Sequence, residues 1–230
     1  QFMSDGTWTF RFRTIRDWNY SSSGQEPVDV TVHENHNSID EGCLHVRFVL
    51  AEGIPDNESL MSDIETAAAV FEGIMIRHDI QVHSSWLESD LDPVLPSPGA
   101  GDTSIEALTN DGPEDTLNII IGETVEIETE GVAGESGGIP GSLRATPHSA
   151  VIVAWLELAG ISGSLDDSKV QMLGETIAHE AGHYLGLVHP VQFDEDLDIV
   201  AWDALDDTRN CNDVDTCLEE LSSNVMFPYL

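Results

Sequence analysis

The chain has 230 residues, of which 43 are acidic and 8 are basic, and its formal net charge is -35 at pH 7. This excess of negative charge excludes nucleic acid as a partner, because phosphate backbones are bound through lysine and arginine. Hydrophobic residues make up 40% of the chain and recur periodically, so the sequence predicts a folded protein. No apolar run approaches the ~18 residues of a membrane-spanning helix, and we expect no membrane span.

The origin of the acidity has two open explanations. One is a solvated surface adapted to a saline environment, and the other is a set of calcium sites. No signal peptide begins at Gln1, so we expect that the targeting segment of an exported protein has already been removed from this sequence.

The length fits a single domain, residues 1–230, with two lobes. Residues 1–40 are interpreted as an N-terminal arm or the remnant of a pro-segment, because residues 7–15 alternate between aromatic side chains and threonine or arginine side chains like a half-buried strand. We expect an upper lobe over residues 41–186 and a lower lobe over residues 187–230.

Further strands are predicted at 28–32, in the arm, and at 44–50, at the start of the upper lobe. A helix follows, with Pro55 and Asn57 at its entry. Its apolar residues recur at the helical period and should face the core: Leu60, Ile64, Ala67, Ala68, Phe71, Ile74 and Met75.

The middle of the chain is predicted to form strands and loops. Residues 80–87 are predicted to form a strand, and 92–102 a surface loop. Compact apolar runs at 117–121 and 150–156 are typical of interior strands of a sheet that is covered on both faces. The glycine-rich segment 131–141 is interpreted either as a flexible connection or as a rim beside a cleft.

A second long helix is predicted to start at Asp166 to Ser168 and to end at Gly186, with Tyr184 or Leu185 facing inward. It carries the sequence H-E-A-G-H-Y-L-G-L-V-H, residues 179 to 189. The first two histidines, His179 and His183, are four residues apart and project from one face of a helix.

Three histidines in this pattern indicate a metal site. A positive φ at Gly186 would reverse the chain and bring His189 to His179 and His183. Three neutral nitrogen ligands with an open fourth position are typical of catalytic zinc, whereas structural zinc is usually closed by four protein ligands. Glu180 then has the place of a general base. A chance arrangement is the alternative, and the length of the pattern argues against it.

The pattern H-E-x-x-H-x-x-G-x-x-H resembles the zinc signature of the metzincin clan of metallopeptidases. Asn224 to Pro228, with Met226 at the centre, is similar to the methionine turn that lies beneath the zinc in this clan. The resemblance implies an α+β fold with a twisted mixed sheet, two long helices and a small irregular C-terminal lobe. It also implies a Zn²⁺-dependent endopeptidase that binds extended protein or peptide substrate beside an edge strand.

The sequence combines features of several metzincin subfamilies. The stretch from Asp203 to Thr208, a cysteine pair and N-x-M resemble pappalysin-like enzymes, which implies Ca²⁺ at Asp203, Asp207 and Thr208. Pro190 is instead similar to serralysins, and Met-Phe-Pro to matrix metalloproteinases. Pro228 replaces the tyrosine that astacin-like and serralysin-like enzymes carry. Metzincins also continue into a C-terminal helix, whereas this sequence ends at Leu230.

The cysteines give some support to the expectation that the protein is exported. Cys211 and Cys217 are close enough in sequence to close a small disulfide loop. Cys43 is then left over, and we interpret it as a buried free thiol; the alternative is a thiol that reaches the metal and keeps the enzyme latent.

We therefore predict a secreted, monomeric zinc endopeptidase with Glu180 as its base. Two alternatives are a non-catalytic zinc-bearing module that binds peptide or a partner protein, and a latent form occluded by the N-terminal arm or Cys43.

Overall fold

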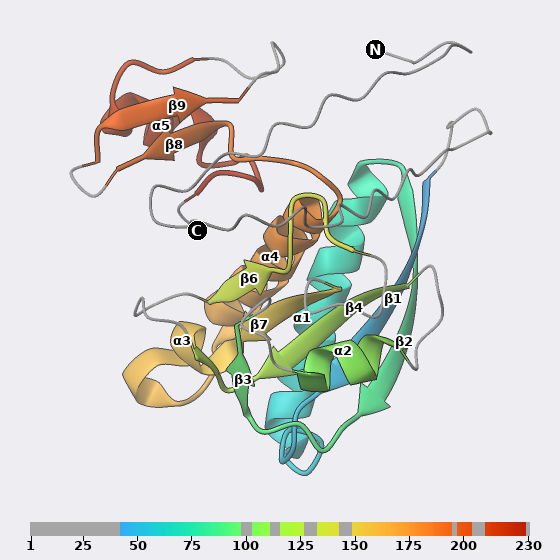
Figure 1. Ribbon diagram of the computed structural model, residues 1–230. Helices are drawn as coiled ribbons and strands as arrows, with labels where there is room; N and C mark the ends of the chain where they lie inside the picture. The colour runs from blue at the N-terminus through green and yellow to red at the C-terminus, as the bar shows by residue number, and fades with distance from the viewer. Residues whose placement is uncertain are drawn as a thin grey trace, which may run out of the picture. The chain divides into compact units, whose positions relative to one another are not determined.

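The computed structural model describes residues 42–97, 103–110, 116–126, 133–142, 149–194, 197–203 and 210–228 (Figure 1). The strands predicted at 7–15 and 28–32 lie outside these residues, so the N-terminal arm stays a prediction. None of the described helices is both long and apolar enough to cross a membrane.

A mixed sheet of five strands forms the centre of the fold, in the order β2-β1-β4-β7-β6. Its first four strands are parallel and β6 runs antiparallel to β7. Every residue of β4 and β7 is buried, as expected of interior strands covered on both faces. The strands are β1 (Gly42–Leu50), β2 (Ile80–Glu88), β4 (Thr116–Gly122), β6 (Gly134–Ser136) and β7 (Ala150–Ala154).

Two long helices pack beside each other against this sheet: α1 (Glu58–Arg77) and α4 (Asp167–Tyr184) (Figure 1). Each begins at a side-chain cap, since Asn57 accepts from the backbone N–H of Leu60 at 3.2 Å and Asp166 from that of Lys169 at 3.0 Å. All the residues predicted to face inward on α1 are buried. The α+β class, the mixed sheet and the two long helices are therefore confirmed.

Several short elements differ from the prediction. The predicted loop at 92–102 contains β3 (Val94–Pro96), which pairs with β5 (Thr124–Glu126) and buries Leu95. The strand predicted at 150–156 ends at Ala154, because Trp155 begins a helix. Short apolar runs do not distinguish a strand from a helix by period alone. Two short helices and a 3₁₀ turn were not predicted: α2 (Thr103–Asn110), α3 (Trp155–Ala159) and η1 (Gly160–Ser162).

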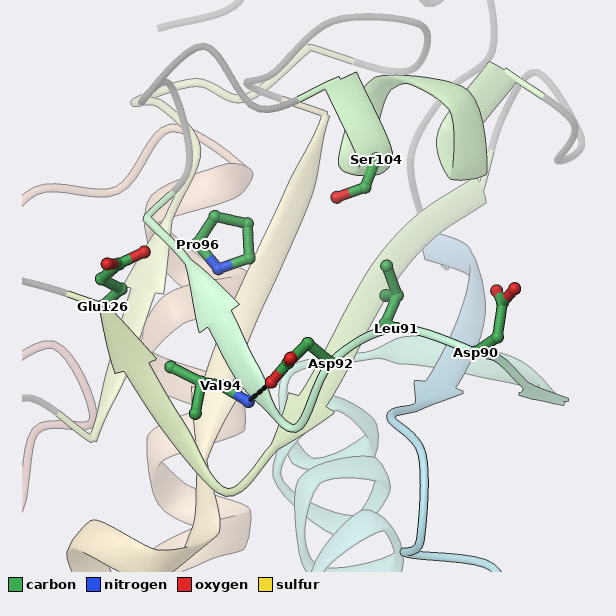
Figure 2. Close-up of a pocket in the computed structure, with 7 residues that line it drawn as sticks. All are labelled: Asp90, Leu91, Asp92, Val94, Pro96, Ser104 and Glu126. Atoms are coloured by element: carbon green, nitrogen blue, oxygen red, sulfur yellow. Dashed lines mark hydrogen bonds between the residues drawn. The ribbon is translucent and has the colours of Figure 1, made fainter.

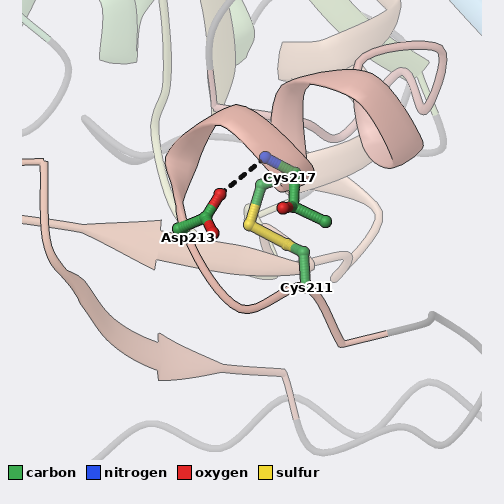
Figure 3. Close-up of a disulfide and its surroundings, with 4 residues drawn as sticks. Cys211, Asp213 and Cys217 are labelled. Atoms are coloured by element: carbon green, nitrogen blue, oxygen red, sulfur yellow. Dashed lines mark hydrogen bonds between the residues drawn. A yellow bond between two sulfur atoms is a disulfide. The ribbon is translucent and has the colours of Figure 1, made fainter.

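The lower lobe, residues 187–228, has its own small hydrophobic core, formed by Val191, Cys211, Cys217, Leu221 and Phe227. The predicted disulfide between Cys211 and Cys217 is present (Figure 3). A helix begins within this loop, and Asp213 caps it by accepting from the backbone N–H of Thr216 at 2.8 Å. The lobe is more regular than expected, with β8 (Val191–Phe193), β9 (Ile199–Trp202) and α5 (Val214–Leu221).

The predicted burial of Cys43 is wrong, because its thiol is free and exposed. Cys43 lies near the start of β1, where residues alternate between intermediate and exposed, whereas the end of the strand is fully buried. Core packing covers only the second half of β1, and the sequence gives no sign of where that cover begins.

Candidate metal centre

The structure brings together the three histidines that the sequence singles out. His179 and His183 project from one face of α4, and each Nε2 atom lies near Nε2 of His189, at 3.0 Å and 2.9 Å respectively. Among the described residues, this is the group of His, Cys, Asp and Glu side chains whose ligand atoms converge as a metal site requires.

The end of α4 returns the chain so that His189 reaches the other two. The backbone N–H of Leu187 donates to the carbonyl of Gly182, and that of Gly186 donates to the carbonyl of His183, both at 2.9 Å. This pair of bonds is the Schellman motif, which requires a left-handed residue at its turn. Gly186 supplies that conformation, with φ of 101°. The predicted helix end and its reversal are both present.

Two main-chain carbonyls set the orientation of the imidazoles. Nδ1–H of His179 donates to the carbonyl oxygen of Val225 at 2.7 Å, and Nδ1–H of His183 donates to that of Leu187 at 2.9 Å. Since Nδ1 carries the hydrogen in both rings, both Nε2 atoms present a lone pair to the centre of the triad. His189 can offer a hydrogen to only one of them at a time, so the arrangement leaves an acceptor unpaired unless a cation lies between the rings.

The electrostatic environment also suits a cation. Burial lowers the pKa of His179 and of His183, and burial with the two neighbouring histidines lowers the pKa of His189 to about 4. All three rings are therefore neutral at pH 7 and able to ligate. Tetrahedral zinc with bonds of ~2.0–2.1 Å holds its nitrogens roughly 3.3 Å apart, so the two distances from Nε2 of His189, 3.0 Å and 2.9 Å, need to lengthen by only a few tenths of an ångström. The residues present fit the metal.

Glu180 lies on the adjoining face of α4, against the edge strand β6. Its side chain is 8% exposed. Burial and the nearby carboxylate of Glu135 raise its pKa to about 7, opposed by a hydrogen bond from the backbone N–H of Ser136. Glu135 is itself held by the hydroxyl of Ser97, which donates to Oε2 at 2.8 Å. The carboxyl group of Glu180 therefore has an affinity for protons suited to proton transfer near neutral pH.

The turn around Met226 contacts both His179 and α4. Asn224 accepts through Oδ1 from the backbone N–H of Met226 at 2.9 Å, and its carbonyl accepts from Phe227 at 2.9 Å. These two hydrogen bonds fix the position of the Val225 carbonyl, which orients His179. The thioether of Met226 is buried and packs on Gly182, where an added Cβ would overlap its sulfur atom.

The predicted calcium site lies mostly outside the described residues. Asp203 is described, while Asp207 and Thr208 lie outside the described residues. The described residues contain no second group of converging metal ligands. Calcium at this segment stays a prediction without support from the structure.

Two cavities lie outside the triad. The larger, of about 930 Å³, lies between the end of α1, the Gly182 face of α4 and residues 222–226. The smaller, of about 620 Å³, contains carboxylates at Asp90, Asp92 and Glu126. Figure 2 shows Asp90 and Glu126 at opposite ends of it, while Asp92 accepts from the backbone N–H of Val94 at 2.8 Å, so these carboxylates do not converge on one point.

Sequence reasoning missed the groups that orient and surround the site. The carbonyls of Leu187 and Val225 are main-chain atoms, which no residue pattern reveals. Strand β6 lies in the glycine-rich segment, where only the interpretation as a cleft rim pointed to a function. Glu135 carried no signal, because one carboxylate among so many has no distinguishing pattern.

No protein-family model matches the chain, and no curated protein matches it. Among solved structures, the chain is similar to archaemetzincin from Methanopyrus kandleri, with 18% identity over 64% of this chain and 75% of that one, and a TM-score of 0.44. It is also similar to metalloproteinase-II from Bacteroides fragilis, with 18% identity over 67% of this chain and 45% of that one, and a TM-score of 0.42. The match thus spans less than half of the Bacteroides protein. Similarity of this degree does not identify an activity, which must be inferred from the site.

Proposed function

We propose that the protein is a zinc-dependent endopeptidase. One observation carries this proposal: three neutral imidazoles converge through their Nε2 atoms, with the buried carboxyl group of Glu180 on the next face of the same helix. Nitrogen-only donors favour zinc over the hard cations calcium and magnesium. A triad leaves a coordination position open, as a catalytic site requires.

Each residue of the site has its own role in the proposed reaction. His179, His183 and His189 would hold the zinc, which supplies a Lewis acid that activates water and polarises the scissile carbonyl. Glu180 accepts the proton of the attacking water and returns it to the leaving amine. The backbone N–H of Ser136 holds the carboxylate in place, while burial and, second to it, the charge of Glu135 keep the pKa of Glu180 raised.

The substrate class follows from the position of β6. This strand ends the sheet beside Glu180, because Ser136 of β6 contacts that carboxylate. An extended peptide can add to an exposed sheet edge through main-chain hydrogen bonds, independently of its side chains. We therefore propose protein or peptide substrates that bind in extended form along β6.

An extracellular location is proposed on the basis of the disulfide between Cys211 and Cys217. Disulfides persist in oxidising compartments and are rare in the cytosol. The acidic composition would suit a saline environment, which is one of the two explanations that the sequence leaves open.

The function is tested by measuring zinc content and cleavage of unfolded casein, with and without a chelator. Wild-type protein should carry one zinc per chain and show chelator-sensitive cleavage. Glu180→Gln should retain zinc but lose cleavage by about 10²-fold or more, the lower end of what a general base contributes. Glu175→Gln on the same helix is the matched control, because Glu175 accepts a hydrogen bond from Gln171. It should leave cleavage unchanged.

Zinc bound without cleavage in wild-type protein would favour a peptide-binding module or a latent form. Cleavage that survives Glu180→Gln would contradict the role of this residue as base.

A further inference from the structure

The outer side of strand β6 is defined by its register with β7. The carbonyl of Ala133 accepts a main-chain hydrogen bond from β7 at 2.8 Å, and the N–H of Gly137 donates one to β7 at 2.9 Å. In an antiparallel pair only every second residue bonds to the partner strand, so Glu135, midway between them, also bonds to β7. The main-chain groups of Gly134 and Ser136 therefore point away from β7, toward the outer edge of the sheet.

The side chains of β6 divide between the two faces of the sheet. A Cβ added at Gly134 would lie 2.8 Å from Cγ of Glu180 and 3.0 Å from Cγ2 of Thr176, so position 134 faces α4. Because side chains alternate along a strand, Glu135 points to the opposite face. There its Oε2 accepts from the hydroxyl of Ser97, the residue after β3, at 2.8 Å. This bond holds the carboxylate of Glu135 beside the outer edge.

The carboxylate of Glu135 can take a further partner. No lysine or arginine among the described residues forms an ion pair with it, and its side chain is half-buried. The bond from Ser97 engages Oε2, so Oε1 can accept from another donor. Glu135 also lies near enough to Glu180 for the two carboxylates to repel each other. A cationic group placed beside Glu135 would relieve this repulsion.

A peptide bound along β6 would place one side chain against Glu135. Antiparallel pairing is the more stable kind per residue, and an antiparallel peptide would bond to Gly134 through both main-chain groups. The next residue of the peptide would then lie directly opposite Glu135, in a pair without main-chain hydrogen bonds, where side chains come closest. Opposite charges in such a pair are stabilising, and like charges are destabilising.

We propose that Glu135 selects substrates that carry lysine or arginine at the residue opposite it on the bound strand. This inference rests on the proposed function, because it names the class of peptide that the same site prefers. Main-chain bonds to β6 are independent of sequence, and Glu135 adds selectivity to them. The formal net charge of -35 attracts cationic peptides to the whole protein, so a test must separate this general attraction from the local one.

A set of quenched fluorescent peptides tests the proposal. The peptides share one neutral sequence, through which a single lysine, glutamine or glutamate is moved position by position, and kcat/KM is measured for each. At one position we expect lysine to exceed glutamine by about 2- to 5-fold, and glutamate to fall below glutamine by a similar factor, as for charged cross-strand pairs. The preference should weaken as salt is added.

Two substitutions of Glu135 and one control locate the preference. Glu135→Gln should remove the preference for lysine, and Glu135→Lys should reverse it in favour of glutamate. Each comparison is made between peptides on the same variant, so a change in overall rate cancels. Glu126→Gln is the matched control, because it removes an exposed carboxylate from β5 and changes the net charge by the same amount as Glu135→Gln. It should leave the preference unchanged.

Peptide binding is measured as well, so that the result does not depend on turnover. The same sequences, each with one fluorophore, are titrated into zinc-loaded Glu180→Gln protein, and the Kd is obtained from fluorescence anisotropy. If lysine peptides bind more tightly through Glu135 but wild-type protein cleaves none of them, the recognition stands and the peptidase activity is contradicted.

Three results would overturn the role of Glu135. Cleavage with no preference for lysine at any position would do so, as would a preference that persists in Glu135→Gln, and in both cases the proposed peptidase function would stand. Absence of both binding and cleavage would overturn this inference and the proposed function together.

Discussion

The upper and lower lobes are stabilised in different ways. The upper lobe buries a continuous core contributed by the sheet, α1 and α4. Among its described residues, the lower lobe has a core of five buried residues. Cores this small supply little stability alone, and proteins of this kind add disulfides or metals. The lower lobe has a disulfide, and it shares the candidate metal centre with α4 through His189 and the carbonyl of Val225.

The largest effect is expected from His189→Ala, which removes the ligand contributed by the lower lobe. Metal affinity should fall by more than about 100-fold, the upper end of the loss seen when a group that only supports a ligand is removed. Cleavage should disappear with the metal. Zinc content and hydrogen exchange over residues 191–221 measure the result, with His78→Ala as control. Full zinc retention would contradict the assignment of His189 as a ligand.

Removing one buried phenylalanine from each core compares the lobes directly. Phe71 and Phe227 are both fully buried, so each substitution by alanine should cost about 3–5 kcal/mol locally. Phe71→Ala should lower the denaturant midpoint of the whole protein. Phe227→Ala should open the lower lobe and release zinc while the upper lobe stays folded. If the two variants unfold alike in one transition, the two cores are a single cooperative unit.

Loss of the disulfide should have a smaller effect. Its loop is short, with a sequence separation of 6, so the double variant Cys211→Ser, Cys217→Ser should destabilise the lower lobe by about 2 kcal/mol on the chain-entropy model. Thermal unfolding followed together with zinc release would locate this loss. Cys43→Ser is the control and should not change the unfolding temperature.

The smallest effect is expected at the helix caps. Asp166 and Asp213 each accept from a backbone N–H in the first turn of their helix, so alanine at either position should cost about 1 kcal/mol. Denaturant unfolding should assign the loss at Asp166 to the upper lobe and that at Asp213 to the lower. Asp213→Asn, which keeps the accepting oxygen, should restore most of the stability.

The long elements were predictable from the sequence because their evidence is periodic. Helix α1 repeats its apolar residues over many turns, and α4 has a cap, a buried face and a terminal glycine in order. The metal ligands were predictable because side chains at fixed helical spacing must share a face. The short elements β3, α2 and α5 have too few residues to establish a period, and tertiary contacts decide their form.

The errors have a common physical origin. Whether Cys43 is buried depends on how far core packing extends along β1, and whether the helix after β7 starts at Trp155 depends on neighbouring strands. The groups that hold Glu180 come from β6, whose pairing with β7 links distant parts of the chain. None of these relations is local in sequence.

The carbonyls that orient His179 and His183 have a consequence for how such a site can vary. Because Leu187 and Val225 contribute only main-chain oxygen, their side chains can be exchanged without removing the acceptor, provided that the turns are kept. Positions 187 and 225 should therefore tolerate many residues in a mutational scan, whereas Gly186 and Asn224, which shape those turns, should not. A search for invariant residues would therefore overlook the two main-chain groups that orient these rings.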